Sequence, residues 1–253
     1  MKKILFLTWA LLAMTGAGAA NRQLSEKSTT MSKLANDTRV FAIDPAIDVQ
    51  GVRFKNRFGI ELAAHLYLPK DFDSSKKYAA IAVSGPFGAV KEQSSGLYAQ
   101  EMARRGFVAM AFDPSFTGES GGQPRSVASP DINTEDFSAA VDFLSANERV
   151  DLERIGILGI CGWGGFAVNA AAIDTRIKAT VASTMYDISR CSANGYYDKM
   201  TVEERYEMRK QLNAQRTIDA KNGTFQRNVM NPKPTDDAPQ FMKDYYDYYK
   251  TER

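Results

Sequence analysis

Apolar runs that alternate with helix-like stretches constrain the fold of this chain more than any other feature. The runs with the length of a buried strand are Tyr78–Val83, Phe107–Phe112, Ile155–Ile160 and Ile177–Met185. Continuous apolar strands of this length are typical of a parallel sheet that is covered on both faces. The alternation therefore predicts an α/β fold with three layers, in which a mostly parallel sheet lies between helices.

The segments between these strands have the composition of helices. Lys91–Arg105 has the length of a helix, which Gly106 would end. A second helix, with its cap at Asn133 or Thr134, is indicated by an apolar stripe at helical spacing, formed by Phe137, Ala140, Val141 and Leu144. Phe166–Ile173 is expected to be a third helix. Each helix would cross from one parallel strand to the next.

The regions before and after this core have a different character. Residues 21–50 form a polar lead-in, and residues 51–190 are the predicted α/β core, which opens with a hairpin of Gly51–Asn56 and Ile60–Leu68. Residues 191–253 contain no apolar run long enough for a central strand, only helix-like charged stretches. We therefore expect a helical cap or lid there and no further central strand of the sheet.

Residues 1–20 have the layout of a secretory signal peptide. Lys2 and Lys3 precede an apolar run, and small residues follow it. A buried helix or a membrane anchor is the alternative, but the run is short for a bilayer. Because no cysteine follows the predicted cleavage region, no lipid anchor is indicated. We expect a periplasmic or secreted protein that has no membrane partner after cleavage.

Composition excludes several classes of function. The chain has 32 Lys and Arg against 30 Asp and Glu, without a basic block, so no nucleic-acid partner is predicted. His65 is the single histidine, so a zinc site built on several imidazoles is excluded and no metal is predicted. Gly121 and Gly122 are followed by no phosphate-binding motif, and we predict no cofactor.

The strongest chemical signal lies directly after the third apolar strand. The sequence from Gly159 to Gly165 reads Gly-Ile-Cys-Gly-Trp-Gly-Gly and opens a predicted helix, as a nucleophile elbow does. In such a turn the nucleophile has a strained backbone, and small neighbours let the strand and helix cross closely. We therefore predict Cys161 as the nucleophile, with Gly159, Gly164 and Gly165 as structural glycines.

The neighbours of Cys161 suit acyl chemistry. The positive end of the following helix favours a thiolate, and the backbone N–H of Gly162 can stabilise an oxyanion. A second N–H is expected from the loop after the first apolar strand. Pro86 has no N–H, so Phe87 is the predicted donor.

These motifs resemble the dienelactone hydrolase-like branch of the α/β-hydrolases, over about Gly51–Asp187. The resemblance includes the Lys91–Gln93 turn, the Asp113–Ser120 loop and the elbow. It implies a Cys, Asp and His triad, with the Asp and the His after two further strands that this chain does not show. Trp163 departs from the pattern, since the usual elbow has a small residue there. His65 cannot substitute, because it lies in the early hairpin, far from the elbow.

Each of these residues also has a plainer interpretation. Cys161 could be a disulfide partner of Cys191 or a small buried apolar residue. Asp187 follows the fourth strand and is better explained as a loop or capping residue than as a triad member. Turn formation accounts as well as substrate contact does for the polar loop residues Asp113, Thr117, Glu119 and Ser120.

Two functions follow from the sequence. The first is an exported hydrolase or acyltransferase that attacks a small ester, lactone or thioester through an acyl-Cys161 intermediate and lacks the catalytic histidine. The alternative is a catalytically inactive truncated or binding form of the same fold. An incomplete sheet would also leave an exposed apolar edge, which predicts self-association.

Overall fold

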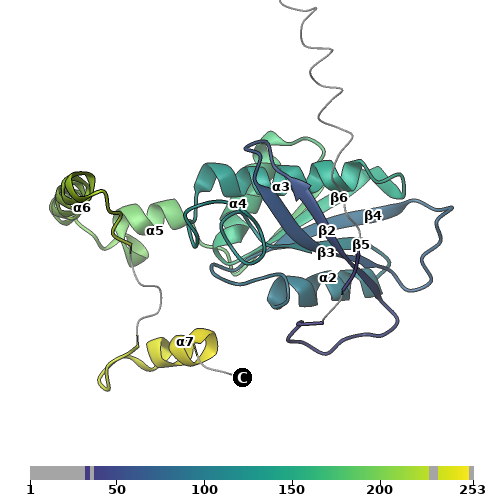
Figure 1. The fold of residues 1–253 in the computed structure, drawn as a ribbon, viewed down its shortest axis with the longest axis horizontal. Helices are drawn as coiled ribbons and strands as arrows, with labels where there is room; N and C mark the ends of the chain where they lie inside the picture. Colours follow the sequence, from purple (N-terminus) through teal and green to yellow (C-terminus); the bar gives the residue numbers. More distant parts are fainter. Residues whose placement is uncertain (1–31, 35–36, 228–232, 251–253) are drawn as a thin grey trace, which may run out of the picture. The chain divides into compact units, whose positions relative to one another are not determined.

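The computed structural model describes residues 32–34, 37–227 and 233–250 (Figure 1). The predicted signal peptide, residues 1–20, lies outside the described residues. The chain divides into two compact units, residues 1–188 and residues 189–253.

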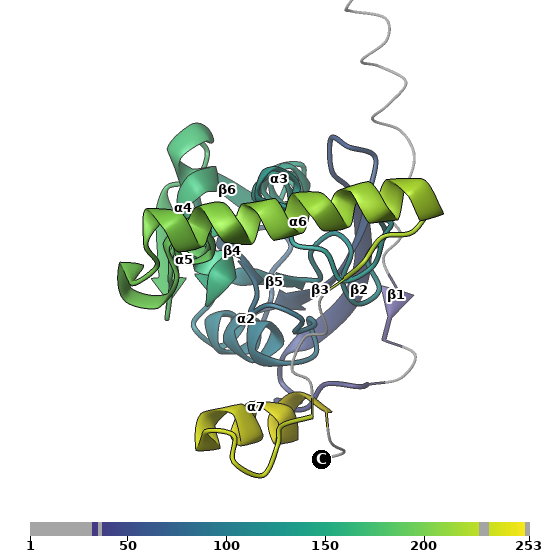
Figure 2. The same cartoon turned by 90° about the vertical axis from the view of Figure 1, so that its left-hand side faces the viewer.

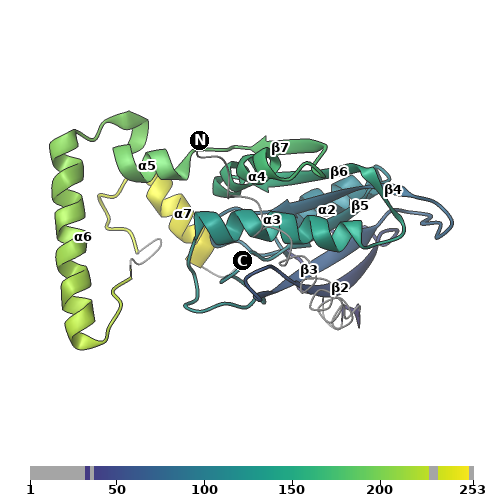
Figure 3. The ribbon, with the colours of Figure 1, turned by 90° about the horizontal axis from the view of Figure 1, so that it is seen from above.

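The first unit contains a seven-stranded sheet with the order β1-β2-β3-β5-β4-β6-β7 (Figure 3). The strands are β1 (Ser32–Lys33), β2 (Asp48–Lys55), β3 (Glu61–Leu68), β4 (Tyr78–Ser84), β5 (Val108–Phe112), β6 (Val150–Ile160) and β7 (Ala179–Ser183). Strands β5, β4, β6 and β7 are parallel, whereas β3 is antiparallel to both β2 and β5. The mostly parallel sheet and the early hairpin are therefore confirmed.

Helices cover both faces of this sheet. They are α2 (Ser94–Arg104), α3 (Pro130–Ser145) and α4 (Gly162–Ile173). Helices α3 and α4 pack together on one face, and α2 packs on the other (Figure 2). Along β4, Ala80 and Ala82 belong to the core below α3 and α4, and Ile81 and Val83 to the core facing α2. The alternation buries both faces of the strand, which explains its continuous apolar sequence.

Three helix starts differ from the sequence-based expectation. Helix α2 begins at Ser94 rather than Lys91, and α4 begins at Gly162 rather than Phe166. The cap of α3 is Ser129, whose hydroxyl accepts a hydrogen bond from the N–H of Ile132 at 3.5 Å. Pro130 at the first helical position favours this start, because its fixed φ suits a helix and its missing N–H is not needed there.

Strand β7 was expected to be buried from Ile177 to Met185, and this expectation is wrong. The strand spans Ala179–Ser183, and Val181 is 48% exposed. Among the described residues β7 lies at the end of the sheet, where it pairs with β6 alone. An apolar run has the same sequence pattern whether it lies at the centre or at the edge of a sheet, so the composition of this run alone does not indicate its exposure.

The polar lead-in, residues 21–50, is attached to the core over its described part. The N–H of Asp44 donates to Gln100 Oε1 at 3.0 Å, and Gln100 Nε2 donates to the carbonyl of Ala42 at 2.9 Å. Arg104 pairs with Asp44 at 2.6 Å. These contacts fix the lead-in against α2, and β2 already begins within it, at Asp48.

The second unit is helical where the structure describes it. Its elements are α5 (Ile188–Asn194), a 3₁₀ turn (Tyr196–Asp198), α6 (Val202–Asn222) and α7 (Gln240–Lys250). Helix α6 starts with a capping box between Thr201 and Glu204 and ends at Gly223, which has a φ of +64°. None of the described helices is both long and apolar enough to cross a membrane.

Candidate active site

Cys161 lies at the bend between β6 and α4, with φ 59° and ψ −127°. This backbone region is strained for any residue other than glycine, and such strain is typical of functional turns. Two hydrogen bonds hold the bend: Cys161 N–H donates to Ser183 O at 2.9 Å, and Gly164 N–H donates to Cys161 O at 2.9 Å. The strained turn that the sequence predicts is therefore present, and the Cys161 side chain is only partly buried.

Two of the three predicted structural glycines are required by close packing. A Cβ on Gly159 would overlap the carbonyl oxygen of Trp163 and lie 2.6 Å from its carbonyl carbon. A Cβ on Gly164 would lie 2.9 Å from the Cβ of Met185. On Gly165 the nearest atom would be 3.5 Å away, an ordinary van der Waals contact. The close crossing of β6 and α4 thus depends on Gly159 and Gly164.

The loop after β4 lies against the elbow. A Cβ on Gly162 would overlap the ring of Phe87, with Cδ2 at 2.6 Å, and a Cβ on Gly85 would lie 2.8 Å from that of Trp163. The Phe87 ring packs edge-on against Trp163, with the ring centroids 4.6 Å apart. The structure thus brings together Cys161, Gly162 and Phe87, the residues predicted to form the nucleophile and its oxyanion donors.

Trp163 is accommodated by the core. Its side chain is 1% exposed and packs edge-on against Phe166, with the ring centroids 5.3 Å apart. Because the indole extends into the core below α3 and α4, the large residue leaves the strand–helix crossing intact. The departure from the usual small residue therefore changes the packing beside the nucleophile and not the turn itself.

His65 lies far from the nucleophile. It is on β3, level with Leu158 of β6 in the sheet register and separated from β6 by β5 and β4. Three strand spacings correspond to about 14 Å. Its Nε2 instead faces Glu92 Oε1 at 3.8 Å. Burial, reinforced by the charge of Lys91 and opposed by Glu92, lowers the pKa of His65 to about 4, so the ring is neutral at pH 7.

The structure places the residues that the sequence offers for a triad carboxylate and for a disulfide. Asp187 directly precedes α5 and is exposed. The residues that the structure describes contain no group of three or more His, Cys, Asp or Glu side chains able to hold a metal ion. Cys161 and Cys191 are both free thiols, so no disulfide joins them in this structure.

A buried ion cluster that the sequence did not indicate lies at the carboxyl edge of the parallel strands. Lys91 has a side chain that is 2% exposed, and its Nζ lies 2.7 Å from Glu92 Oε1, 3.1 Å from Asp113 Oδ2 and 3.3 Å from Glu119 Oε2. A lysine is almost never fully buried unless it is paired. The sequence signal available was weak: Lys91 follows the loop after β4, and Asp113 follows β5, so both lie at the carboxyl edge of the parallel strands.

The loop after β5, residues 113–120, is a structural turn around this cluster. The Ser120 hydroxyl donates to the carbonyl of Asp113 at 2.7 Å and accepts from the N–H of Ala63 at 2.8 Å. The N–H of Thr117 donates to the carbonyl of Pro114 at 3.1 Å. These bonds favour the turn interpretation of Asp113, Thr117 and Ser120 over direct substrate contact.

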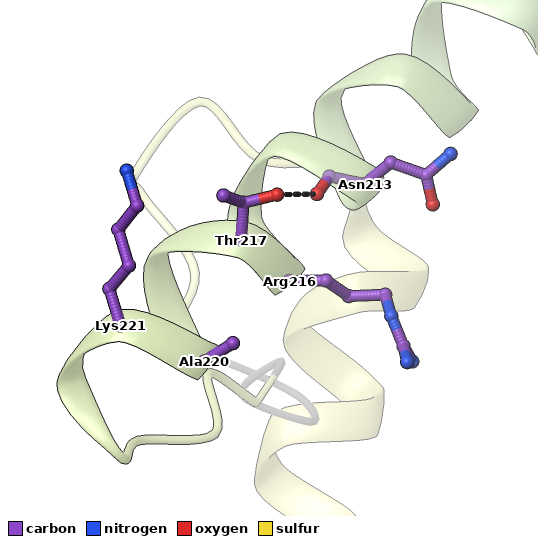
Figure 4. Close-up of a pocket in the computed structure, with 5 residues that line it drawn as sticks. All are labelled: Asn213, Arg216, Thr217, Ala220 and Lys221. Atoms are coloured by element: carbon purple, nitrogen blue, oxygen red, sulfur yellow. Dashed lines mark hydrogen bonds between the residues drawn. The ribbon is translucent and has the colours of Figure 1, made fainter.

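A pocket on α6 is a poor candidate for a site. Its lining residues are Asn213, Arg216, Thr217, Ala220 and Lys221, which all belong to that one helix (Figure 4). The hydroxyl of Thr217 donates to the carbonyl of Asn213 at 3.2 Å, as is common within a helix. No groups from different elements converge there, in contrast to the elbow.

Comparisons with known proteins agree with the fold. The family of X-Pro dipeptidyl-peptidases (S15 family) matches residues 59–247. The uncharacterized protein PA2218 of Pseudomonas aeruginosa is 51% identical over 98% of this chain and 68% of its own length. The crystal structure of PA2218 gives a TM-score of 0.80 at 55% identity, covering 88% of this chain and 69% of that chain.

Two more distant proteins have names that refer to hydrolases. The thiohydrolase aneE of Aspergillus aculeatus is 32% identical over 52% of this chain and 40% of its own length. The α/β hydrolase GrgF from Penicillium sp. sh18 has a TM-score of 0.62 at 21% identity, covering 79% of this chain and 66% of that chain, which shows the fold alone. The chain has the α/β-hydrolase fold and belongs to the X-Pro dipeptidyl-peptidase (S15) family.

Proposed function

We propose that this protein takes an acyl group from a small carboxylic ester, lactone or thioester onto the sulfur of Cys161. The observation that carries the proposal is the strained backbone of Cys161, at φ 59°, between a buried parallel strand and a helix N-terminus. The similarity to a protein named thiohydrolase supports an acyl substrate of this class. A cysteine at this position also supports our assignment to the dienelactone hydrolase-like branch.

The acylation step needs groups that surround Cys161. The thiolate attacks the carbonyl carbon, so that an S–C bond forms and the carbonyl oxygen takes up the negative charge. We assign the N–H groups of Gly162 and Phe87 as donors to this oxyanion. The bond to the leaving alkoxide or thiolate then breaks, the leaving group takes a proton from water, and a thioester remains on Cys161.

The next step has no visible general base. Hydrolysis of a thioester at useful rates requires a group that activates water, most often a histidine. His65, the single histidine, lies on β3 and faces Glu92. We therefore propose that the chain as given acylates once and then retains the acyl group.

A second candidate function is a binding form of the same fold that performs no chemistry. The separation of His65 from Cys161 by two intervening strands favours this binding form. At that separation His65 cannot activate water for the hydrolysis of an acyl-Cys161. The two candidates differ in one measurable respect. The first forms a covalent adduct with an activated ester, whereas the second binds an ester without cleaving it.

A chromogenic ester separates these outcomes. We expect p-nitrophenyl acetate to release about one equivalent of nitrophenol per chain in a burst, followed by a negligible steady rate. Cys161→Ala should abolish the burst, and Cys191→Ala, the matched control, should retain it. A wild-type protein without a burst supports the binding form. If the wild type turns over continuously and Cys161→Ala abolishes this turnover, the proposal that the chain retains its acyl group is refuted.

A further inference from the structure

The carboxylate of Asp113 holds Lys91 through both its main chain and its side chain. The N–H of Lys91 donates to Asp113 Oδ1 at 2.7 Å, and its Nζ donates to Asp113 Oδ2 at 3.1 Å. The N–H of Glu119 adds a third bond, to Oδ2 at 2.9 Å. Asp113 is 0% exposed, so it joins the loop after β4 to the loop after β5 inside the protein.

The two side chains have the geometry of a buried ion pair, with Lys91 Nζ 3.1 Å from Asp113 Oδ2. Burial lowers the pKa of Lys91, but the charge of Asp113 and the hydrogen bond with Glu92 outweigh it, so that the pKa is raised overall. Burial raises the pKa of Asp113, against the opposing charge of Lys91 and two N–H donors. A carboxylate that faces a cation and two backbone N–H groups is stabilised in its ionised form. Removing the Lys91 ammonium would leave the buried carboxylate of Asp113 without that cation.

The pair fixes one end of the loop that carries Phe87. At the other end of this loop, residues 85–90, Ser84 continues β4 and its hydroxyl donates to the carbonyl of Phe112 at 3.1 Å. Phe87 lies between these two fixed points, with its ring against Gly162. Its backbone N–H therefore depends on Lys91 for its position, although Lys91 itself does not reach Cys161.

We propose that Lys91 and Asp113 are positioning residues, which hold the Phe87 N–H where the oxyanion of an acylating Cys161 forms. This inference rests on the proposed function, because it assigns a role within the acylation step. Preorganised donors act only if they are already in place when the charge develops, and losing one costs about 10²- to 10³-fold in rate. A buried ion pair with two-point attachment supplies that rigidity, since it fixes both the main chain and the side chain of Lys91.

Two reagents distinguish positioning from general damage. Acylation by p-nitrophenyl acetate passes through an oxyanion, whereas alkylation by iodoacetamide does not, and both modify the same sulfur. The rates are read on the peptide that contains Cys161 by mass spectrometry. In Lys91→Met we expect acylation to fall about 10²-fold while alkylation stays at the wild-type rate. Glu119→Gln, the control, removes a negative charge near Lys91 Nζ but keeps the bonds between Lys91 and Asp113, and should acylate normally.

Gly118→Ala provides a second variant with every charge intact. Gly118 has a φ of +53°, and a Cβ there would overlap Asp113 Oδ2 and lie 2.5 Å from Asp113 Cγ. The displaced carboxylate should lower acylation selectively, so this variant decides the question if Lys91→Met does not fold. Wild-type acylation in a folded variant of either kind overturns the positioning role, as does an equal fall of acylation and alkylation. A wild-type Cys161 that is alkylated but never acylated refutes the proposed function instead.

Discussion

The carbonyl of Trp163 lies directly against Gly159, and a Cβ on Gly159 would be 2.6 Å from the carbonyl carbon. Ala167 Cβ would be 2.8 Å away, so neither the helix backbone nor its side chains leave room. We predict that Gly159→Ala destabilises the fold by about 1–3 kcal/mol, as is usual when a packed core is overfilled. Urea unfolding followed by circular dichroism measures this loss.

Gly165→Ala is the matched substitution on the same turn. Its Cβ would meet its nearest neighbour at 3.5 Å, and the residue lies within α4. Because alanine loses less backbone entropy than glycine in a helix, we expect this variant to be as stable as wild type or more stable by about 0.5–1 kcal/mol. Equal losses at Gly159 and Gly165 would contradict the close crossing of β6 and α4.

His65 predicts a dependence of stability on pH. Burial lowers its pKa in the folded protein to about 4, below the value of 6.5 expected in the unfolded chain. Protonation therefore favours the unfolded state, and stability that is complete above pH 6.5 falls between pH 6.5 and pH 4. The loss should reach about 3 kcal/mol at the lower limit. Urea unfolding at a series of pH values measures it.

The control for this prediction is His65→Gln, which keeps a polar side chain without an ionisation in this range. The carboxylates of the protein also titrate there, so the informative quantity is the difference between the two proteins. Wild type should lose more stability than His65→Gln as the pH falls from 6.5 to 4. If the free energies of unfolding of the two proteins fall in parallel with pH, His65 is hydrated or protonated in the folded state, and the prediction is wrong.

The sheet and the elbow could be predicted from the sequence because their signals are local. Buried parallel strands such as Tyr78–Ser84 have continuous apolar sequences, and a glycine on each side of Cys161 is the local requirement of the turn. The contact between Phe87 and Gly162 followed from topology, since both lie at the carboxyl ends of neighbouring strands. These features need no knowledge of distant side chains.

The ion cluster could not be predicted in this way, and the composition of the Ile177–Met185 run alone does not indicate its exposure. Lys91 and Asp113 are 22 residues apart in sequence, and a lysine before a helix is ordinarily an exposed residue. Its burial depends on the neighbouring Glu92 and on two carboxylates, those of Asp113 and Glu119, that only the folded chain brings to it. Strand β7 has an apolar sequence but an exposed position, because position within a sheet is set by tertiary pairing and not by composition.

The exposed edge of β7 predicts self-association. Val181 and Met185 are 48% and 46% exposed, and in the described part of the chain β7 pairs on one side only. Unpaired strand edges with apolar side chains promote pairing between chains. Sedimentation velocity should show a concentration-dependent oligomer, which Val181→Lys reduces. A monomer that binds no hydrophobic dye would exclude an exposed apolar edge as the basis of association.

The composition of residues 1–20 predicts export. Expressed from its full sequence in a bacterial host, the chain should be recovered outside the cytoplasm, with its N-terminus near Asn21. N-terminal sequencing of the recovered protein tests this directly. Replacing Lys2 and Lys3 by Glu should retain the uncleaved chain in the cytoplasm, and cytoplasmic recovery of the uncleaved wild type would contradict the prediction.

The acyl state of Cys161 is the most direct test of the account. Wild type is treated with an activated ester, quenched, digested and analysed by mass spectrometry. The account predicts a thioester on the Cys161 peptide that persists after the ester is removed, that hydroxylamine releases, and that Gly162→Val reduces by displacing Phe87. An unmodified Cys161 in a folded protein whose thiol reacts with iodoacetamide would contradict it.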